Sequence, residues 1–178
     1  MVINEVDYDN PGTDTAEFLE LYNPGTTSFS LSNVSVVLVN GANSSSYLTT
    51  SLASLTSLAP GEYVVMGTTP VVSALPPAVR SLTFSMASDN IQNGAPDGVA
   101  VVSGATTVLD SLSWEGATTW DAGTVSIPLQ EGAASTAMLA DSAADGGSIA
   151  RVPNGSDTNV NATDFVFVGT PTPGARNP

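Results

Sequence analysis

Hydrophobic and polar residues alternate with a period of two over several short stretches of the chain, a pattern typical of β-strands rather than helices. One such strand puts Glu17 and Glu20 on opposite faces. Another puts Val108 and Trp114 on the same face as Asp110. The clearest predicted strands cover residues 2–6, 16–22, 34–39, 62–66, 99–102, 108–114, 148–152 and 164–168.

Turn residues separate these strands, for example Asn23-Pro24-Gly25 and Pro60-Gly61. Short strands joined by such turns favour a β-sandwich or a β-barrel. Helix is scarce, because residues 133–144, the best helical candidate, lack a periodic apolar stripe. We expect the long segments 43–57 and 115–145 to be extended loops. The predicted fold class is therefore all-β, with extended loops and little helix.

The length of the chain, 178 residues, predicts one domain over residues 1–178. A chain of this size buries roughly 70 % of the surface that its unfolded form exposes, so it needs no disulfide or metal for stability. No stretch approaches the roughly 20 apolar residues of a membrane-spanning helix. Met1 directly precedes strand-like residues, and we expect that any leader has been removed.

The charge of the chain is strongly negative, at −14, because 17 acidic residues face only three arginines and no lysine. Nucleic-acid binding rests on cations that displace counterions from phosphates, so we expect no nucleic-acid partner. Anionic membrane surfaces are disfavoured for the same reason. Such a surface suits calcium, a cationic partner or a salty medium.

The amino-acid types present exclude most catalytic chemistry. The chain has no histidine, cysteine or lysine, so serine–histidine, cysteine–histidine and serine–lysine nucleophiles are impossible. Only carboxylate chemistry survives, such as that of a glycosidase with two facing acids. Glu17 and Glu20 do not face each other, and no Asp-Thr-Gly or Asp-Ser-Gly motif is present. We therefore predict that the chain is not an enzyme.

Several motifs along the chain resemble one family when they are taken in order. The chain begins Val-Ile-Asn-Glu-Val and continues with Ala-Glu-Phe-Leu-Glu-Leu-Tyr-Asn-Pro-Gly from Ala16. Later come Leu-Ala-Pro-Gly-Glu-Tyr-Val-Val from Leu58 and Asp-Gly-Val-Ala-Val from Asp97. The series closes with Gly-Ser-Ile-Ala-Arg-Val-Pro-Asn-Gly from Gly147 and Thr-Pro-Gly-Ala-Arg-Asn from Thr172. In this order and spacing the set resembles the bacterial lamin tail domain.

The resemblance implies an immunoglobulin-like β-sandwich, in agreement with the predicted strands. It also implies a secreted or cell-surface protein of bacterial origin, in which the domain is an accessory module beside hydrolases. The family has no catalytic residues, so none are carried over. The long segments 43–57 and 115–145 depart from the plain pattern of the family.

Arg151 lies in a predicted strand of a chain that has almost no cations. It could recognise an anionic ligand. We favour a structural ion pair with Asp110, Glu17 or Glu20, because a buried arginine needs a carboxylate partner.

Two groups of oxygen-bearing residues are candidates for a calcium site. The first is Asp7, Asp9 and Asp14 in one acidic loop, and the second is Asp157, Asn159 and Asn161. The second begins like an EF-hand loop, but Ala162 stands where the turn glycine belongs, so an EF-hand is rejected. A looser calcium site stays open, and the alternative for both groups is ordinary turn chemistry.

Trp120 is a candidate ligand contact, because an exposed tryptophan can stack on a sugar ring. Trp114 falls on the apolar face of its strand, and we expect it in the core. Three functions compete. The first is a non-catalytic secreted or surface module that positions or tethers a larger protein, with no required cofactor. The second is a calcium-dependent or polysaccharide-binding surface domain. The third is a carboxylate glycosidase.

Overall fold

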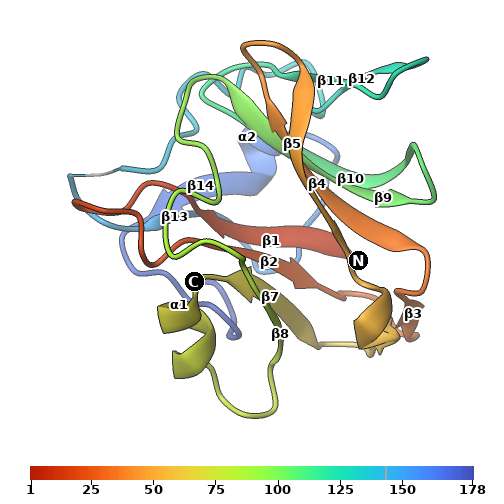
Figure 1. The fold of residues 1–178 in the computed structure, drawn as a ribbon, viewed down its shortest axis with the longest axis vertical. Coiled ribbons are helices and arrows are strands. Elements are labelled where there is room, and N and C mark those ends of the chain that lie inside the picture. Colours follow the sequence, from red (N-terminus) through yellow and green to blue (C-terminus); the bar gives the residue numbers. More distant parts are fainter. Residues whose placement is uncertain (143) are drawn as a thin grey trace.

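The computed structural model describes residues 1–142 and 144–178. Two sheets pack face to face as an immunoglobulin-like β-sandwich (Figure 1). One sheet has the strand order β14-β13-β1-β2-β7-β8 and the other β10-β9-β4-β5, and only the β7–β8 pair is parallel. The six-stranded sheet contains β1 (Val2–Asp7), β2 (Phe18–Tyr22), β7 (Tyr63–Gly67), β8 (Arg80–Thr83), β13 (Ser148–Arg151) and β14 (Phe165–Val168). The four-stranded sheet contains β4 (Val34–Asn40), β5 (Ser45–Ser51), β9 (Asp97–Ser103) and β10 (Thr107–Trp114).

The remaining elements are short. Two strand pairs, β3 (Phe29–Ser30) with β6 (Ser57–Leu58) and β11 (Thr119–Asp121) with β12 (Ser126–Pro128), lie outside the main sheets. The helices are α1 (Thr69–Ala74), α2 (Asn161–Asp164) and the 3-10 turn η1 (Ala53–Leu55). The prediction of an all-β, immunoglobulin-like sandwich with little helix is confirmed.

The main core fills the space between the two sheets. Alternate residues of each strand point into it, as the period of two requires. Trp114 at the end of β10 is fully buried there and stacks on Tyr8, with ring centroids 5.0 Å apart. The six-stranded sheet contributes, among others, Ile3, Val6, Leu19, Leu21, Val64 and Met66, and the four-stranded sheet Val36, Leu38, Val99, Val101 and Leu112.

A β-bulge in β10 changes which residues share a face. Val108 pairs with Val102 and Asp110 with Val101, so the register shifts between Val108 and Asp110. Asp110 therefore lies on the same side as Trp114, whereas Val108 packs against a second cluster outside the sandwich. The prediction that Val108 shares a face with Asp110 is wrong, because an extra residue in a strand reverses the alternation beyond it.

The second cluster lies on the outer face of the four-stranded sheet. The β11–β12 hairpin covers this face, and its Trp120 packs with Val37, Val39 and Leu129. Segment 115–145 is therefore partly a hairpin and not loop throughout. Segment 43–57 was also expected to be loop, yet it contains the edge strand β5 and η1. Strand β5 consists mostly of serine and threonine because one side of it faces solvent. The apolar pattern that predicts a strand is therefore missing from this stretch of the sequence.

The outer face of the six-stranded sheet is covered by α1 and by the C-terminal residues (Figure 1). Asn177 donates hydrogen bonds from Nδ2 to the Asn4 and Arg151 carbonyl oxygens, both at 3.0 Å. Thr172 donates from its backbone N–H to Glu5 at 2.9 Å. This cover explains how polar residues of β1 and β2 are buried on a face that points away from the core.

Candidate functional site

Arg151 on β13 is fully buried and joins distant parts of the chain. Its Nη2 donates to both carboxylate oxygens of Asp110, each at 3.0 Å, and such charge-assisted hydrogen bonds are stronger than neutral ones. Its Nη1 donates to Asp164 Oδ2 at 3.0 Å and lies 3.4 Å from Asp157 Oδ1. Its Nε donates to the Ile3 carbonyl at 2.7 Å. These contacts engage the guanidinium nitrogens of Arg151 within the chain, so the side chain has a structural role rather than a ligand-binding one.

Negative charge exceeds positive charge around Arg151. Burial raises the pKa of Asp110, while Arg151 and the N–H of Ile3 lower it. Burial, together with the nearby Asp110 and Asp157 carboxylates, raises the pKa of Glu131 to about 7. The guanidinium carbon of Arg151 lies 4.5 Å from the centroid of the Phe165 ring, which adds a cation–π contact.

Part of the second calcium candidate lies in this cluster. Carboxylate oxygens of Asp110, Glu131 and Asp157 lie within 4.8 Å of one another, so these three groups could hold a cation. Asn161 is close by, but its Oδ1 accepts the Glu131 N–H at 2.9 Å. Asn159 is exposed in a left-handed turn, and its N–H binds Asp157 Oδ1. The structure thus brings Asp157 and Asn161 to Glu131 and turns Asn159 away.

The first calcium candidate is a loop closed by its own hydrogen bonds. Asn10 Nδ2 donates to Asp7 Oδ1 at 2.5 Å, and the Asn10 N–H binds Asp14 Oδ1 at 2.9 Å. Asn93 Nδ2 reaches Asp9 Oδ1 at 3.4 Å and Asp14 Oδ2 at 3.3 Å. In the part of the chain that the structure describes, Asp7, Asp9 and Asp14 do not form a group of metal-ligand spacing.

Glu17 and Glu20, named from sequence as partners for Arg151, lie elsewhere. Glu17 accepts hydrogen bonds from the N–H groups of Asn90 and Ile91 at 2.9 and 2.7 Å and so anchors that loop. Glu20 accepts the Gly174 N–H at 2.6 Å. Of the three candidate carboxylates, Asp110 alone pairs with Arg151. The two glutamates do not, because their strand positions point them at other loops.

Trp120 is 7 % exposed and packs under the β11–β12 hairpin against the four-stranded sheet. The expectation that its ring is open to a sugar is wrong. Alternate residues of β4 and β9 form a small apolar cluster on the outer face of the four-stranded sheet, and Trp120 covers this cluster.

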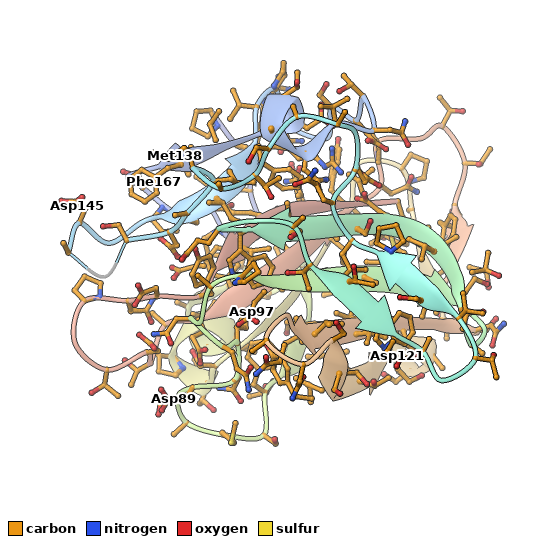
Figure 2. The ribbon with its side chains drawn as sticks, turned by 90° about the horizontal axis from the view of Figure 1, so that it is seen from above. Asp89, Asp97, Asp121, Met138, Asp145 and Phe167 are labelled. Atoms are coloured by element: carbon orange, nitrogen blue, oxygen red, sulfur yellow. The ribbon has the colours of Figure 1, made fainter. Side chains whose placement is uncertain are left out.

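Apolar side chains gather on the surface at the edge strand β14, a feature that sequence reasoning missed. Val166 is 43 % exposed, Phe167 40 % and Met138 94 %. They line a hollow of about 280 Å³ together with Ser135, Leu139, Ala162 and Phe165. Figure 2 shows Met138 and Phe167 at the same margin of the molecule. We call Met138, Val166, Phe167 and this hollow the β14 edge surface.

The sequence did hold a signal for this surface. Phe-Val-Phe-Val in β14 is an uncharged strand, and strand 164–168 was predicted. Its place at the edge depends on the sheet order, which no local pattern gives.

The fold and these sites define a class: an immunoglobulin-like β-sandwich with an internal ion-pair cluster and an apolar strand edge. A family model described as Lamin Tail Domain matches residues 1–156, and the chain belongs to this family. Domains of this family are immunoglobulin-like, often serve as interaction modules and are generally non-catalytic. No curated protein and no solved structure matches the chain. None of the described helices has the length and apolar character needed to span a bilayer.

Proposed function

We propose that the chain is a non-catalytic interaction module that binds an extended segment of a basic partner protein along β14. In this way it positions or tethers a larger protein in a secreted or cell-surface setting. The observation that carries the proposal is the β14 edge surface, where three of the five exposed large hydrophobic residues in the described part of the chain lie.

The edge of β14 lacks the protection that natural sheets place on edge strands. Such strands are normally blunted by charges, prolines or bulges, because an open edge pairs with other chains. β14 has none of these, since its four residues are Phe165, Val166, Phe167 and Val168 in regular register with β13. Across residues 1–142 and 144–178, no other strand pairs with its outer side. An added strand from a partner would pair with this edge.

Charge argues that the partner is basic and not a second copy of this chain. Two copies would each bring a net charge of −14. The loops around β14 carry Asp145, Asp157 and Glu131, and Figure 2 shows Asp145 on the same side as Phe167. Basic residues that flank an apolar strand would meet these acids, and their attraction would favour the correct partner over others. The same charge disfavours nucleic acids.

The non-catalytic part of the proposal rests on side-chain chemistry. With no histidine, cysteine or lysine, catalysis would need paired carboxylates at an open cleft. Glu5 and Glu20 sit side by side across β1 and β2, but both are fully buried. The Thr172 and Gly174 N–H groups cover them. A glycosidase role is therefore not supported.

The test uses a synthetic eight-residue peptide of alternating valine and threonine with lysines at both ends, titrated into the full chain. A scrambled peptide of the same composition is the reference. We expect the alternating peptide to bind and Val166→Lys to weaken it at least tenfold, because a lysine on the edge repels the peptide and blocks pairing.

Val125→Lys is the matched control, because Val125 is a similarly exposed valine (47 %) in the β11–β12 hairpin. Equal binding of the two peptides, or equal loss in the two variants, would overturn the proposal. Sedimentation of the free chain tests whether a second copy of the chain, rather than a partner, pairs with this edge. A concentration-dependent dimer that Val166→Lys abolishes would show self-pairing in place of a partner.

A further inference from the structure

A second surface feature lies apart from the β14 edge, between α1 and the C-terminal residues. It is a cavity of about 350 Å³, near the lower end of the roughly 300–1,000 Å³ typical of ligand pockets. Its walls are apolar and include Phe18, Val71, Leu75 and Pro173. We call it the Asp7 pocket, because Asp7 is the one polar residue among those that line it.

Asp7 is 4 % exposed and has acidic neighbours but no cation. The groups that face it are Glu5 on β1, Glu17 before β2 and Asp141 in the loop before β13. Neither α1 nor the C-terminal wall adds a charged group to the lining. Asn10 Nδ2 donates to Asp7 Oδ1 at 2.5 Å, and the carboxyl groups of Asp7 and Asp141 share a hydrogen bond. No ion pair to Asp7 occurs among the described residues.

The chain supplies no cation of its own to this carboxylate. It has no lysine. Arg151 is enclosed in the Asp110 cluster, and Arg80 donates to the Leu55 and Ser57 carbonyls. Arg176, the third arginine, forms no ion pair with Asp7 among the described residues. A buried carboxylate without a cation is costly, and here burial and Asp141 raise the pKa of Asp7 to about 9. An external cation would remove this cost.

We propose that the Asp7 pocket binds a primary alkylammonium group, with the alkyl chain against Phe18, Val71 and Leu75 and the ammonium at Asp7. Apolar walls with one acid at the end match an aliphatic chain that ends in a positive charge. The group can come from a free amine or from a lysine side chain of a partner protein. The inference is independent of binding at β14.

Binding of the ammonium displaces the proton that Asp7 holds in the empty pocket. The amine itself stays protonated below about pH 10, as a lysine amine does. Affinity therefore rises with pH, by nearly tenfold per pH unit between pH 7 and 8.5, because one proton leaves for each cation bound.

The test titrates the full chain with n-butylammonium at pH 8.5 and follows the amide signals of Phe18, Val71 and Leu75 by NMR. 1-Butanol is the neutral probe of the same shape. We expect butylammonium to bind at least tenfold more tightly than butanol. Equal binding of the two probes, which would show an apolar hollow only, overturns the proposal, as does the absence of binding.

Two variants locate the effect. Asp7→Asn keeps an oxygen for Asn10 and should weaken butylammonium binding at least tenfold with butanol unchanged. Ala74→Trp places a large side chain at the pocket lining and should block both probes, which keeps the test valid if Asp7→Asn fails to fold. Asp121→Asn, at an exposed position in the separate β11–β12 hairpin, is the control and should change nothing. Undiminished binding in the folded Asp7→Asn or Ala74→Trp variant overturns the proposal.

A lysine-containing peptide and its Nε-acetylated form distinguish the two sources. Binding of the peptide that acetylation abolishes supports a partner lysine. Binding of butylammonium without binding of the peptide supports a free amine.

Discussion

Arg151 joins four separate segments of the chain through one guanidinium group. Asp110 comes from β10, Asp164 from α2, Asp157 from the preceding loop and the Ile3 carbonyl from β1. Removal of one partner from a buried ion pair leaves the other charges uncompensated, at a cost of about 3–5 kcal/mol. We therefore expect Arg151→Met to lower the free energy of unfolding in urea by about that amount.

Arg80→Met is the control for this experiment. Arg80 lies 3.9 Å from Glu62, and their side chains are 35 % and 44 % exposed. Such exposed pairs contribute about 0–1 kcal/mol, and the hydrogen bonds of Arg80 to the Leu55 and Ser57 carbonyls are only partly buried, so Arg80→Met should cost less than Arg151→Met. Similar losses in the two variants would contradict the structural role of Arg151.

Glu20 gives the protein a pH dependence opposite to ordinary acid denaturation. Burial, opposed by hydrogen bonds from Asn4 and the Gly174 N–H and assisted by the charge of Glu5, raises its pKa from 4.5 to about 8. The folded state thus binds a proton that the unfolded state releases between these values. Its contribution to stability is complete below about pH 4.5 and is lost as the pH rises to about 8.

The matching prediction concerns urea unfolding at pH 5, 7 and 9. We expect the wild-type free energy of unfolding to fall from pH 5 to pH 9. The free energy of unfolding of Glu20→Gln should fall less, and at pH 9 the two decreases should differ by on the order of a few kcal/mol. Glu62→Gln, at a partly exposed position, should follow the wild type. Parallel curves for wild type and Glu20→Gln would show that Glu20 is not the group responsible.

At the scale of elements, the C-terminal segment closes the outer face of the six-stranded sheet. Thr172 and Gly174 cover Glu5 and Glu20, and Asn177 ties β1 to β13. Deletion of residues 170–178 would expose both glutamates. We expect a lower free energy of unfolding at pH 5 and a weaker decrease between pH 5 and 9, measured by urea unfolding. An unchanged pH profile after deletion would contradict this role.

Calcium binding can be tested at the Asp110–Glu131–Asp157 cluster, which joins residues from separate elements of the fold. Arg151 already supplies a cation to two of these three acids. We therefore expect equal melting temperatures in calcium chloride and in EDTA at matched ionic strength. A ligand that binds only the folded state raises stability, so a calcium-specific rise of several degrees would show a metal site. Glu131→Gln would then remove that rise.

β2 and β4 could be predicted from the sequence, β2 from the alternation of its residues and β4 from its short apolar run between turn residues. The partner of Arg151 could not be chosen among Asp110, Glu17 and Glu20. Alternation places Asp110 on the face of Trp114, but the contact with Arg151 depends on how β13 of the other sheet lies relative to β10, which local periodicity does not give. Trp120 was misjudged because a short hairpin, and not solvent, covers the outer face of the four-stranded sheet.

Over the whole molecule, the net negative charge and the apolar β14 edge surface have opposite effects on association with other chains. A net charge of −14 disfavours association between copies of the chain, whereas the β14 edge surface offers an uncharged strand for pairing. This combination is the basis for proposing a basic partner rather than a second copy. The site depends on sheet order, which makes β14 an end strand of the six-stranded sheet, and on the segment that brings Met138 beside it.

The most direct test of this central claim is amide hydrogen exchange in β14 with and without the lysine-flanked strand peptide. We expect saturating peptide to slow exchange at residues 165–168, with no change in β5, β8 or β10, the other edge strands of the two sheets. Val166→Lys should remove this protection. Peptide binding with no slowed exchange in β14, or with protection at β5, β8 or β10 instead, would contradict binding along β14.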